Sequence, residues 1–243
     1  MSGAERRRRA LDAAAPPERA DRAVIHPPVI RGGAGIRSVS LVVGLFLFAL
    51  GIVLQLQSDL GLSPWDVLSQ GISDQTSLSF GTANIVIAIV VLAVAWALGA
   101  QIGVGTVANA ILIGLFIDGL TRLEPIESLA GHGIGAQLAL LVGGIVLVSL
   151  GSGFYIGAAK GAGPRDSLMI VGARRTGVRI GIVRAAIEIA VAVVGFALGG
   201  TVGIGTIAFA FGIGPAVEVV FRLLVRSGVA EPSALQREYD RRR

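Results

Sequence analysis

No lysine or arginine occurs between Ser38 and Thr121. This stretch is several times longer than the roughly 20 apolar residues that one helix needs to cross the hydrocarbon core of a bilayer. Across the whole chain 53% of residues are hydrophobic and 15% are charged, whereas a soluble domain carries roughly 25% charged residues. The mean hydropathy is +0.76. The sequence therefore predicts an all-α, polytopic bundle of transmembrane helices with the lipid bilayer as its surroundings.

Six apolar windows are long enough to be transmembrane helices. They cover Ser38–Gln57, Phe80–Ala100, Val104–Thr121, Ile134–Gly157, Ile180–Gly200 and Ile204–Phe221. Two further segments, Pro64–Thr76 and Pro164–Thr176, are too short and too polar to cross. We expect these two segments to be half-helices that are either re-entrant or interfacial.

Both half-helices begin with residues that are typical of helix starts. In the first, Ser63 can cap free N–H groups, Pro64 suits the first helical position, and Asp66 puts a carboxylate in the first turn. The second repeats the proline and the carboxylate, with its starting residues at Gly163, Pro164 and Asp166.

The two halves of the chain align without a gap at an offset of 100 residues. Glycine, proline and acidic residues match in this register, which is a stronger signal than matching apolar residues in membrane spans. The matches include Gly51 with Gly151, Gly61 with Gly161, Pro64 with Pro164, Asp66 with Asp166, Gly81 with Gly181, Gly114 with Gly214, and Gly103-x-Gly105-Thr106 with Gly203-x-Gly205-Thr206. The sequence predicts two membrane repeats, residues 36–123 (repeat 1) and 134–223 (repeat 2), each with three spans and one half-helix.

An odd number of crossings per repeat inverts the second copy relative to the first. With the arginine-rich N-terminus in the cytoplasm, three crossings put the half-helix region of repeat 1 outside and that of repeat 2 inside. The outer region has Asp59, Asp66 and Asp74 as its charges, and the inner one carries five basic residues: Lys160, Arg165, Arg174, Arg175 and Arg179. Because cytoplasmic loops are enriched in lysine and arginine, this pattern predicts inverted-topology repeats with both termini cytoplasmic.

The two ends of the chain are polar and rich in arginine. Residues 1–35 are predicted to be a disordered basic arm and residues 227–243 a polar basic tail, and anionic lipid headgroups are the expected partners of both. The arm lacks the apolar region of a signal peptide. The net charge of +5 comes mainly from these tails and one loop, so nucleic acid is not an expected partner.

Charged residues at membrane depth are costly and therefore mark candidate sites. The candidates for a substrate or ion site are Asp66, Asp166, Arg165, Arg184, Glu188 and Glu218. Arg184 and Glu188 lie one turn apart on the fifth span, so we expect them to pair inside the bundle, with Asp166 or Glu218 as further partners. The pair has two interpretations: it locks the span in place, or it belongs to a substrate or proton site.

The two half-helix aspartates also have two interpretations. Asp66 and Asp166 cap N–H groups of their own helices, or they lie where two broken helices meet, as in inverted-repeat transporters. In the second case Arg165 would face an anionic group. Glu218 is also consistent with an interfacial anchor, and Trp65 and Tyr155 with belt or packing aromatics.

No catalytic or metal site can be assembled from the sequence. Cysteine is absent, and the two histidines, His26 and His132, lie far from each other and from any carboxylate cluster. The Gly103-x-Gly105 string opens an apolar span rather than following a strand, which argues against a dinucleotide fingerprint. We expect no cofactor, no metal and no enzymatic activity.

The chain resembles the YczE/YyaS/YitT family of bacterial membrane proteins, and its YczE-like branch in particular. The resemblance covers about residues 37–221 and is carried by the half-helix starts, the Gly-x-Gly-Thr strings and the Arg184-x-x-x-Glu188 pair. It implies a multi-pass protein of the bacterial plasma membrane, with an activity that the family leaves undefined. The matching motif positions are Pro64, Asp66, Pro164, Arg165, Asp166, Arg184, Glu188 and Thr206. Repeat 1 departs from the repeat 2 pattern by having Trp65 where repeat 2 has Arg165.

Two functions are compatible with these features. The first is a secondary-transporter-like permease for an unknown small molecule, indicated by repeated half-helices and intramembrane charges. The second is a membrane scaffold or regulatory protein whose basic tails recruit a cytoplasmic partner or anionic lipid.

Overall fold

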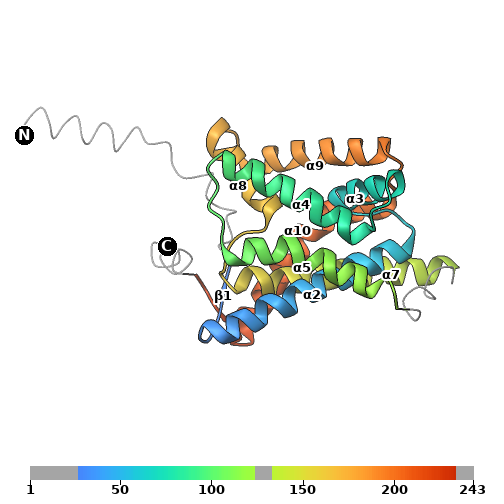
Figure 1. Cartoon of the computed structure of the whole chain (residues 1–243). Helices are drawn as coiled ribbons and strands as arrows, with labels where there is room; N and C mark the ends of the chain where they lie inside the picture. The colour runs from blue at the N-terminus through green and yellow to red at the C-terminus, as the bar shows by residue number, and fades with distance from the viewer. Residues whose placement is uncertain (1–26, 124–132, 234–243) are drawn as a thin grey trace, which may run out of the picture. The chain divides into compact units, whose positions relative to one another are not determined.

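A computed structural model describes residues 27–123 and 133–233 of the chain. These residues form eight helices and a two-residue strand at either end (Figure 1). In chain order the elements are β1 (Val29–Ile30), α2 (Ala34–Ser58), α3 (Pro64–Gln75), α4 (Phe80–Ala97), α5 (Val104–Leu120), α7 (Gly133–Gly157), α8 (Pro164–Thr176), α9 (Ile180–Ala197), α10 (Ile204–Arg226) and β2 (Ala230–Glu231). The all-α architecture expected from the sequence is thereby confirmed for the described residues.

Five of the helices are long and apolar enough to cross a bilayer: α2, α4, α7, α9 and α10. The sixth predicted span corresponds to α5, an apolar helix of 17 residues. At 1.5 Å per residue, the 12 residues of α3 and the 13 of α8 reach only about 18 to 20 Å, too short for the roughly 30 Å of hydrocarbon.

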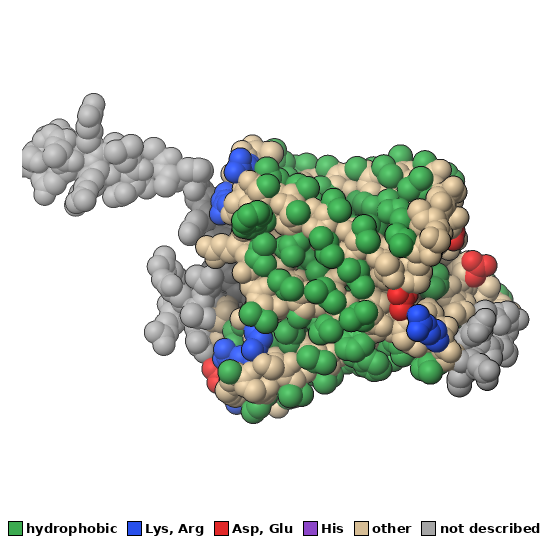
Figure 2. Space-filling model, viewed as in Figure 1, with side chains coloured by type: hydrophobic (Ala, Val, Ile, Leu, Met, Phe, Trp, Pro, Cys, Tyr) green, Lys and Arg blue, Asp and Glu red, His purple; other side chains and the backbone are tan. Residues whose placement is uncertain are grey.

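The surface between the ends of the helices is largely hydrophobic. In the view of Figure 2, apolar side chains cover the middle of the face, and the charged side chains gather toward its two margins. Large apolar residues such as Val104, Phe196 and Phe211 are more than half exposed. Such a surface needs lipid around it, because a soluble monomer rarely exposes large contiguous apolar patches.

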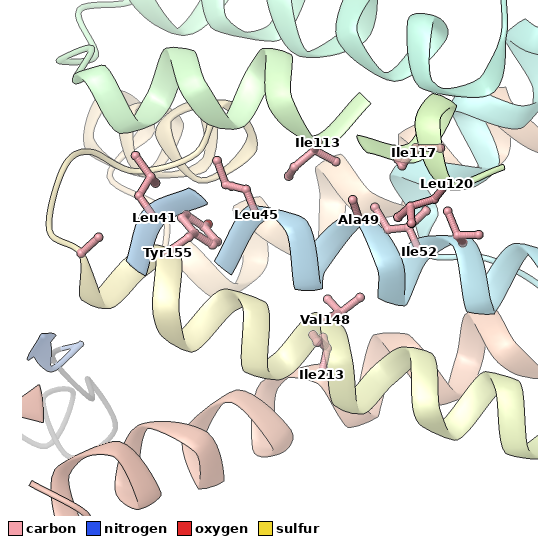
Figure 3. Packing of buried hydrophobic residues seen from close by; sticks show 12 residues of the cluster. Leu41, Leu45, Ala49, Ile52, Ile113, Ile117, Leu120, Val148, Tyr155 and Ile213 are labelled. Carbon is pink, nitrogen blue, oxygen red and sulfur yellow. The ribbon is translucent and has the colours of Figure 1, made fainter. Parts of the chain in front are cut away.

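The main apolar core lies between α2, α5, α7 and α10 (Figure 3). Leu45 and Ile52 of α2 are fully buried, and they pack in one cluster with Ile117 of α5, Val148 of α7 and Ile213 of α10. Helix α2 and helix α7 make the most extensive contact in the structure.

Glycines allow α2 and α7 to approach closely. A Cβ on Gly44 would lie 2.5 Å from the Tyr155 N atom and 2.8 Å from the Gly151 carbonyl oxygen, and a Cβ on Gly51 would lie 2.6 Å from the Gly144 oxygen. At the offset of 100, Gly44 aligns with Gly144 and Gly51 with Gly151. The contact of Gly44 with Gly151 therefore corresponds to the contact of Gly51 with Gly144 when repeat 1 and repeat 2 are exchanged.

Two further contacts, here called the inter-repeat clamps, hold the loop before each half-helix. The Gly205 N–H donates to the Leu60 oxygen at 2.7 Å, and the Gly105 N–H donates to the Lys160 oxygen at 2.9 Å. Each half-helix is thus anchored to the start of the third long helix of the other repeat. The loop glycine that makes this approach has a positive φ, +108° at Gly61 and +128° at the aligned Gly161, which favours glycine.

The two repeats differ in how their second long helix packs. In repeat 1, α4 packs closely against α5, whereas in repeat 2 α9 makes no comparable contact with α10 and packs against α3 and α8 instead. In Figure 1, α9 runs along the upper edge of the view.

The ends of the described unit differ from the prediction. Residues 27–35 were expected to belong to a disordered arm and residues 227–233 to a tail, yet β1 and β2 pair antiparallel, with Val29 opposite Glu231 and Ile30 opposite Ala230. Ile30 and Ala230 are buried against the ends of α7 and α10, which gives the pairing an apolar contact. The rest of both predicted tails lies outside the described residues.

Candidate functional site

The first half-helix starts with a buried carboxylate. Ser63 is the N-cap of α3, and its side chain accepts a hydrogen bond from the Asp66 N–H. The Ser63 hydroxyl also donates to Asp66 Oδ2. Ser63 and Asp66 are each 2% exposed, so this capping group lies inside the protein. A carboxylate in the first turn is also favoured by the positive end of the helix dipole.

Asn84 of α4 supplies the second contact to this carboxylate. Its Nδ2 atom lies 3.5 Å from Asp66 Oδ1 and 3.3 Å from the Ser69 hydroxyl. Asn84 is 4% exposed and Ser69 is fully buried. Ser63 and Asn84 of repeat 1 thereby contact Asp66, and Ser69 in turn contacts Asn84, so the buried carboxylate has hydrogen-bond partners.

The cation beside Asp66 comes from the other repeat. Arg165, at the second position of α8, places Nη2 3.7 Å from Asp66 Oδ1, and its guanidinium lies 5.2 Å from the centre of the Trp65 ring. Trp65 and Arg165 occupy aligned positions in the two repeats. The starts of α3 and α8 therefore meet: their second residues, Trp65 and Arg165, make a cation–π contact, and Arg165 also forms an ion pair with Asp66, the third residue of α3.

The second half-helix lacks the serine cap. Gly163 has no side chain to offer, and Asp166 instead accepts a hydrogen bond from the Tyr155 hydroxyl of α7 at 2.9 Å. Within the described residues no lysine or arginine lies within ion-pair distance of Asp166. Asp166 is half-buried, whereas Asp66 is closed off from the surface.

Arg184 and Glu188 form the ion pair expected from their spacing, with Arg184 Nε 2.8 Å from Glu188 Oε1. Their burial differs from the expectation. The Arg184 side chain is 47% exposed and that of Glu188 20% exposed, because α9 is not covered by α10. The expected sharing with Asp166 or Glu218 does not occur, since Asp166 binds Tyr155 and Glu218 pairs with Arg222 one turn along α10.

The structure therefore brings together three of the six candidate residues, Asp66, Arg165 and Asp166, with the motif residues Ser63, Pro64, Gly163 and Pro164 at the two helix starts. Sequence reasoning missed Asn84, Ser69 and Tyr155 as members of this cluster. Tyr155 was expected to be a belt or packing aromatic, but it is 5% exposed and hydrogen-bonded. An asparagine inside a charge-free apolar window was the available signal for Asn84.

The cluster contains several groups that can bind a ligand. It presents a guanidinium, a half-buried carboxylate, a phenol and the two half-helix starts. The indole N–H of Trp65 is buried and has no acceptor among the described residues. Within the same residues no three His, Cys, Asp or Glu side chains gather to hold a metal.

The fold and this site define a class: a multi-pass α-helical membrane protein with a polar cluster between two half-helices. The model of a family of unknown function, DUF6198, matches residues 35–222, and the chain belongs to that family. It is 34% identical over 167 residues to the uncharacterized membrane protein YczE of Bacillus subtilis, covering 68% of this chain and 75% of YczE. These matches confirm the family prediction.

Two further relatives are also without an assigned function. An uncharacterized protein of Haemophilus influenzae is 38% identical over 190 residues, which cover 76% of this chain and 85% of that protein. The uncharacterized protein YyaS of Bacillus subtilis is 28% identical over 131 residues, covering 53% and 64%. No solved structure matches the chain.

Proposed function

We propose that the chain is a secondary-transporter-like permease for a small molecule, without catalytic activity, in the bacterial plasma membrane. The observation that carries the proposal is the ion pair between Asp66 and Arg165, which joins the starts of the half-helices of two different repeats. Broken helices whose ends meet at a repeat interface are the usual substrate-binding element of inverted-repeat transporters. Asp166, half-buried and without a cation partner among the described residues, is the group in this cluster with free capacity for a ligand.

Six crossings are favoured by the pairing of β1 with β2. The first precedes α2 and the second follows α10, so the two ends of the bundle lie on the same side. An even number of crossings is then required, which adds α5 to the five longer helices. Its 17 residues reach the lower end of the range for transmembrane helices, about 17 to 25 residues.

Inverted repeats are favoured by charge and by the exchanged contacts. The last turn of α8 and the loop after it carry Arg174, Arg175 and Arg179, whereas the last turn of α3 and the loop after it carry no basic residue. Arg175 Nε donates to the Leu98 oxygen at 2.8 Å, and the aligned Gln75 donates to the Leu198 oxygen at 3.1 Å. With the clamps and the glycine contacts of α2 and α7, this pair fits two copies related by a two-fold axis in the membrane plane, with both termini cytoplasmic.

A ligand screen tests the proposal. The purified full chain is heated in the presence of single metabolites, and a ligand that binds the native state raises the apparent melting temperature. Any hit is then followed as uptake into reconstituted vesicles by the parent, by Asp166→Asn and by Glu231→Gln, which lies outside the cluster. We expect binding and uptake to be lost in Asp166→Asn alone. A ligand that binds both variants like the parent would place the site elsewhere.

The scaffold alternative predicts the opposite dependence on the tails. Removing residues 1–26 and 234–243 leaves every described element in place, so a permease keeps ligand binding and uptake. A scaffold that recruits anionic lipid or a cytoplasmic partner through its arginines loses that recruitment, which co-sedimentation with anionic vesicles measures.

A further inference from the structure

Repeat 1 shows how a short loop, the start of its second long helix and its third long helix fit together. At Gly81 of α4 there is no room for a Cβ, which would lie 2.5 Å from Asp118 Oδ1 and overlap the Gly114 oxygen of α5. Asp118 accepts from the Gly81 N–H at 2.8 Å and from the Ser79 hydroxyl at 2.5 Å. The carboxylate of α5 thus caps the first turn of α4 across a glycine–glycine contact.

Repeat 2 has residues that correspond to those of this contact, but they do not touch each other. Gly181 of α9 and Gly214 of α10 align with Gly81 and Gly114, and a Cβ on either would meet no atom of the described residues within 4 Å. Helix α9 begins without a side-chain cap, and Glu218, aligned with Asp118, binds Arg222 instead. A glycine inside an exposed helix costs up to about 1 kcal/mol relative to alanine, and nothing in the present packing explains Gly214.

The residues that face each other in the repeat 1 contact have complementary counterparts in repeat 2. The hydrogen-bonded pair of Ser79 and Asp118 aligns with Arg179 and Glu218, a cation and an anion. The same comparison applies to the middle of the helix. Asn84 and Ala88 of α4 are 4% and 7% exposed, whereas the aligned residues of α9 are the charged pair Arg184 and Glu188, whose side chains are 47% and 20% exposed. Charged side chains in the middle of a membrane-spanning helix are unfavourable when they face lipid.

We propose that α9 has a second position, in which its first turns dock on α10 as α4 docks on α5. In this position Gly181 lies against Gly214, and Glu218 caps α9 and pairs with Arg179. Docking also buries the Arg184–Glu188 pair. The inference rests on the repeat arrangement of the proposed function, but it requires no substrate.

Two details of the structure fit such a movement. Pro215 lies inside α10 directly after Gly214, and a proline removes one backbone hydrogen bond and permits a bend there. In repeat 1, Asn84 reaches Asp66. Docking α9 in the same way brings the aligned Arg184 to Asp166, which supplies the cation that Asp166 lacks in the described residues and closes the candidate site on that side.

Paired cysteines in this cysteine-free chain test the second position. The test pair is Ile182→Cys with Glu218→Cys, because the aligned side chains, Thr82 Oγ1 and Asp118 Oδ2, are 3.2 Å apart. The matched pair is Thr82→Cys with Asp118→Cys. The control pair is Ile189→Cys with Glu218→Cys, on the same face of α9 but about 10 Å further along it. Each full chain is oxidised mildly in native membranes, and non-reducing gels separate bonds within one chain from bonds between two.

We expect a disulfide within one chain for the test pair and for the matched pair, and none for the control pair, since a disulfide needs Cα atoms within about 7 Å. The proposal would be overturned if the test pair formed no disulfide, or no more of it than the control pair. It would also be overturned if the disulfide linked only two copies of the chain. Each of these results concerns the movement of α9 and is obtained without a transported molecule, so it is distinguishable from a failure of the permease function.

A second set of variants guards against misfolding of the cysteine chains. Gly214→Ala and Gly212→Ala are each added to the test pair, and a Cβ at either position meets nothing within 4 Å in the present arrangement. Both should fold with the parent's melting temperature or a higher one. We expect Gly214→Ala to lose the test disulfide, because its Cβ would meet the backbone of the docked α9, and Gly212→Ala to keep it. Equal disulfide yields in the two variants would contradict the docked geometry.

Discussion

At the scale of single residues, the candidate site is held by one buried carboxylate and by groups from both repeats. Asp66 binds Ser63 and Asn84 of its own repeat and Arg165 of the other. Ser63 and Asn84 are uncharged and could also hydrogen-bond to an asparagine at position 66. An ion pair with the Arg165 guanidinium, in contrast, requires the negative charge of Asp66. The link between the repeats therefore depends on the ionisation of Asp66 and on the presence of Arg165.

A double-mutant cycle measures this link. Arg165→Gln should lower the free energy of unfolding by about 1 to 3 kcal/mol, since it leaves a buried carboxylate without its cation. Asp66→Asn in the same chain should restore part of the loss, with a coupling energy of about 0.5 to 3 kcal/mol between the two positions. Thermal or denaturant unfolding in detergent gives the four values. Strictly additive losses would mean that the 3.7 Å contact contributes no stability.

Aligned glycines offer a prediction in which each variant controls the other. Gly81→Ala should destabilise the protein by about 1 to 3 kcal/mol, because its Cβ has no space between α4 and α5. Gly181→Ala adds the same atom in open space and should change stability by less than about 1 kcal/mol. The melting temperatures of the two variants, compared with that of the parent, measure these stability changes. Equal losses would show that α9 is packed against α10 in the resting protein.

The sequence identified only part of the candidate site. Asp66 and Arg165 stand out because each lies in the first turn of a short helix that begins with a proline, Pro64 or Pro164. Tyr155 and Asn84 carry no charge, and an aromatic near a span end is usually a belt residue, so their roles depend on helix rotation that spacing alone does not define. The exposure of Arg184 depends on the absence of packing between α9 and α10, which no local pattern predicts.

At the scale of elements, backbone contacts fix the starts of the half-helices, while their apolar residues pack against α4 and α9. Each begins just after a loop whose carbonyl accepts a hydrogen bond from the Gly-x-Gly string of the other repeat. Thr106 and Thr206 fix the geometry of these strings, because each hydroxyl accepts from the N–H of the glycine three residues before it. Side chains at the string glycines would push the half-helices away.

The clamps can be tested as a matched pair. A Cβ on Gly103 would overlap the Lys160 oxygen, and a Cβ on Gly203 would overlap the Leu60 oxygen. We expect Gly103→Ala and Gly203→Ala each to lower stability by about 1 to 3 kcal/mol, and Gly212→Ala, which enters open space, to have no such effect. The unfolding midpoints of the three purified variants supply the comparison. A loss for one clamp alone would show that the half-helices are not anchored equivalently.

Helix positions were predictable where local chemistry determines them. The predicted start of α4 at Phe80 and that of α3 at Pro64 agree with the structure, because Ser79 and Ser63 act as caps. The strands at the two ends were not predicted. Two residues each are too few for a periodic signal, and β1 pairs with β2 only because the bundle between them returns to its starting side.

At the scale of the whole described unit, several helix contacts of one repeat recur in the other, and the largest difference lies at the second long helix. The α2–α7 glycines and the clamps recur with the repeats exchanged, while the α4–α5 contact has no counterpart between α9 and α10. The two copies therefore pack alike where they meet and differently at their periphery. Packed helix contacts tend to switch between discrete arrangements rather than adjust continuously. This combination favours a bundle with more than one stable arrangement.

The orientation of the two copies is open to direct measurement. If the repeats are inverted, the loop after α3 and the loop after α8 lie on opposite sides of the membrane, as their charges suggest. Single cysteines replace Ser77 and Val178, both exposed, and Val178 is preferred to the neighbouring Gly177, whose φ of +70° favours glycine. In intact cells a membrane-impermeant maleimide should label Ser77→Cys but not Val178→Cys. Val178→Cys should be labelled only after the membrane has been permeabilised. Labelling of both from outside would mean that the copies are parallel, and the pairing of β1 with β2 would then require four crossings per repeat instead of three.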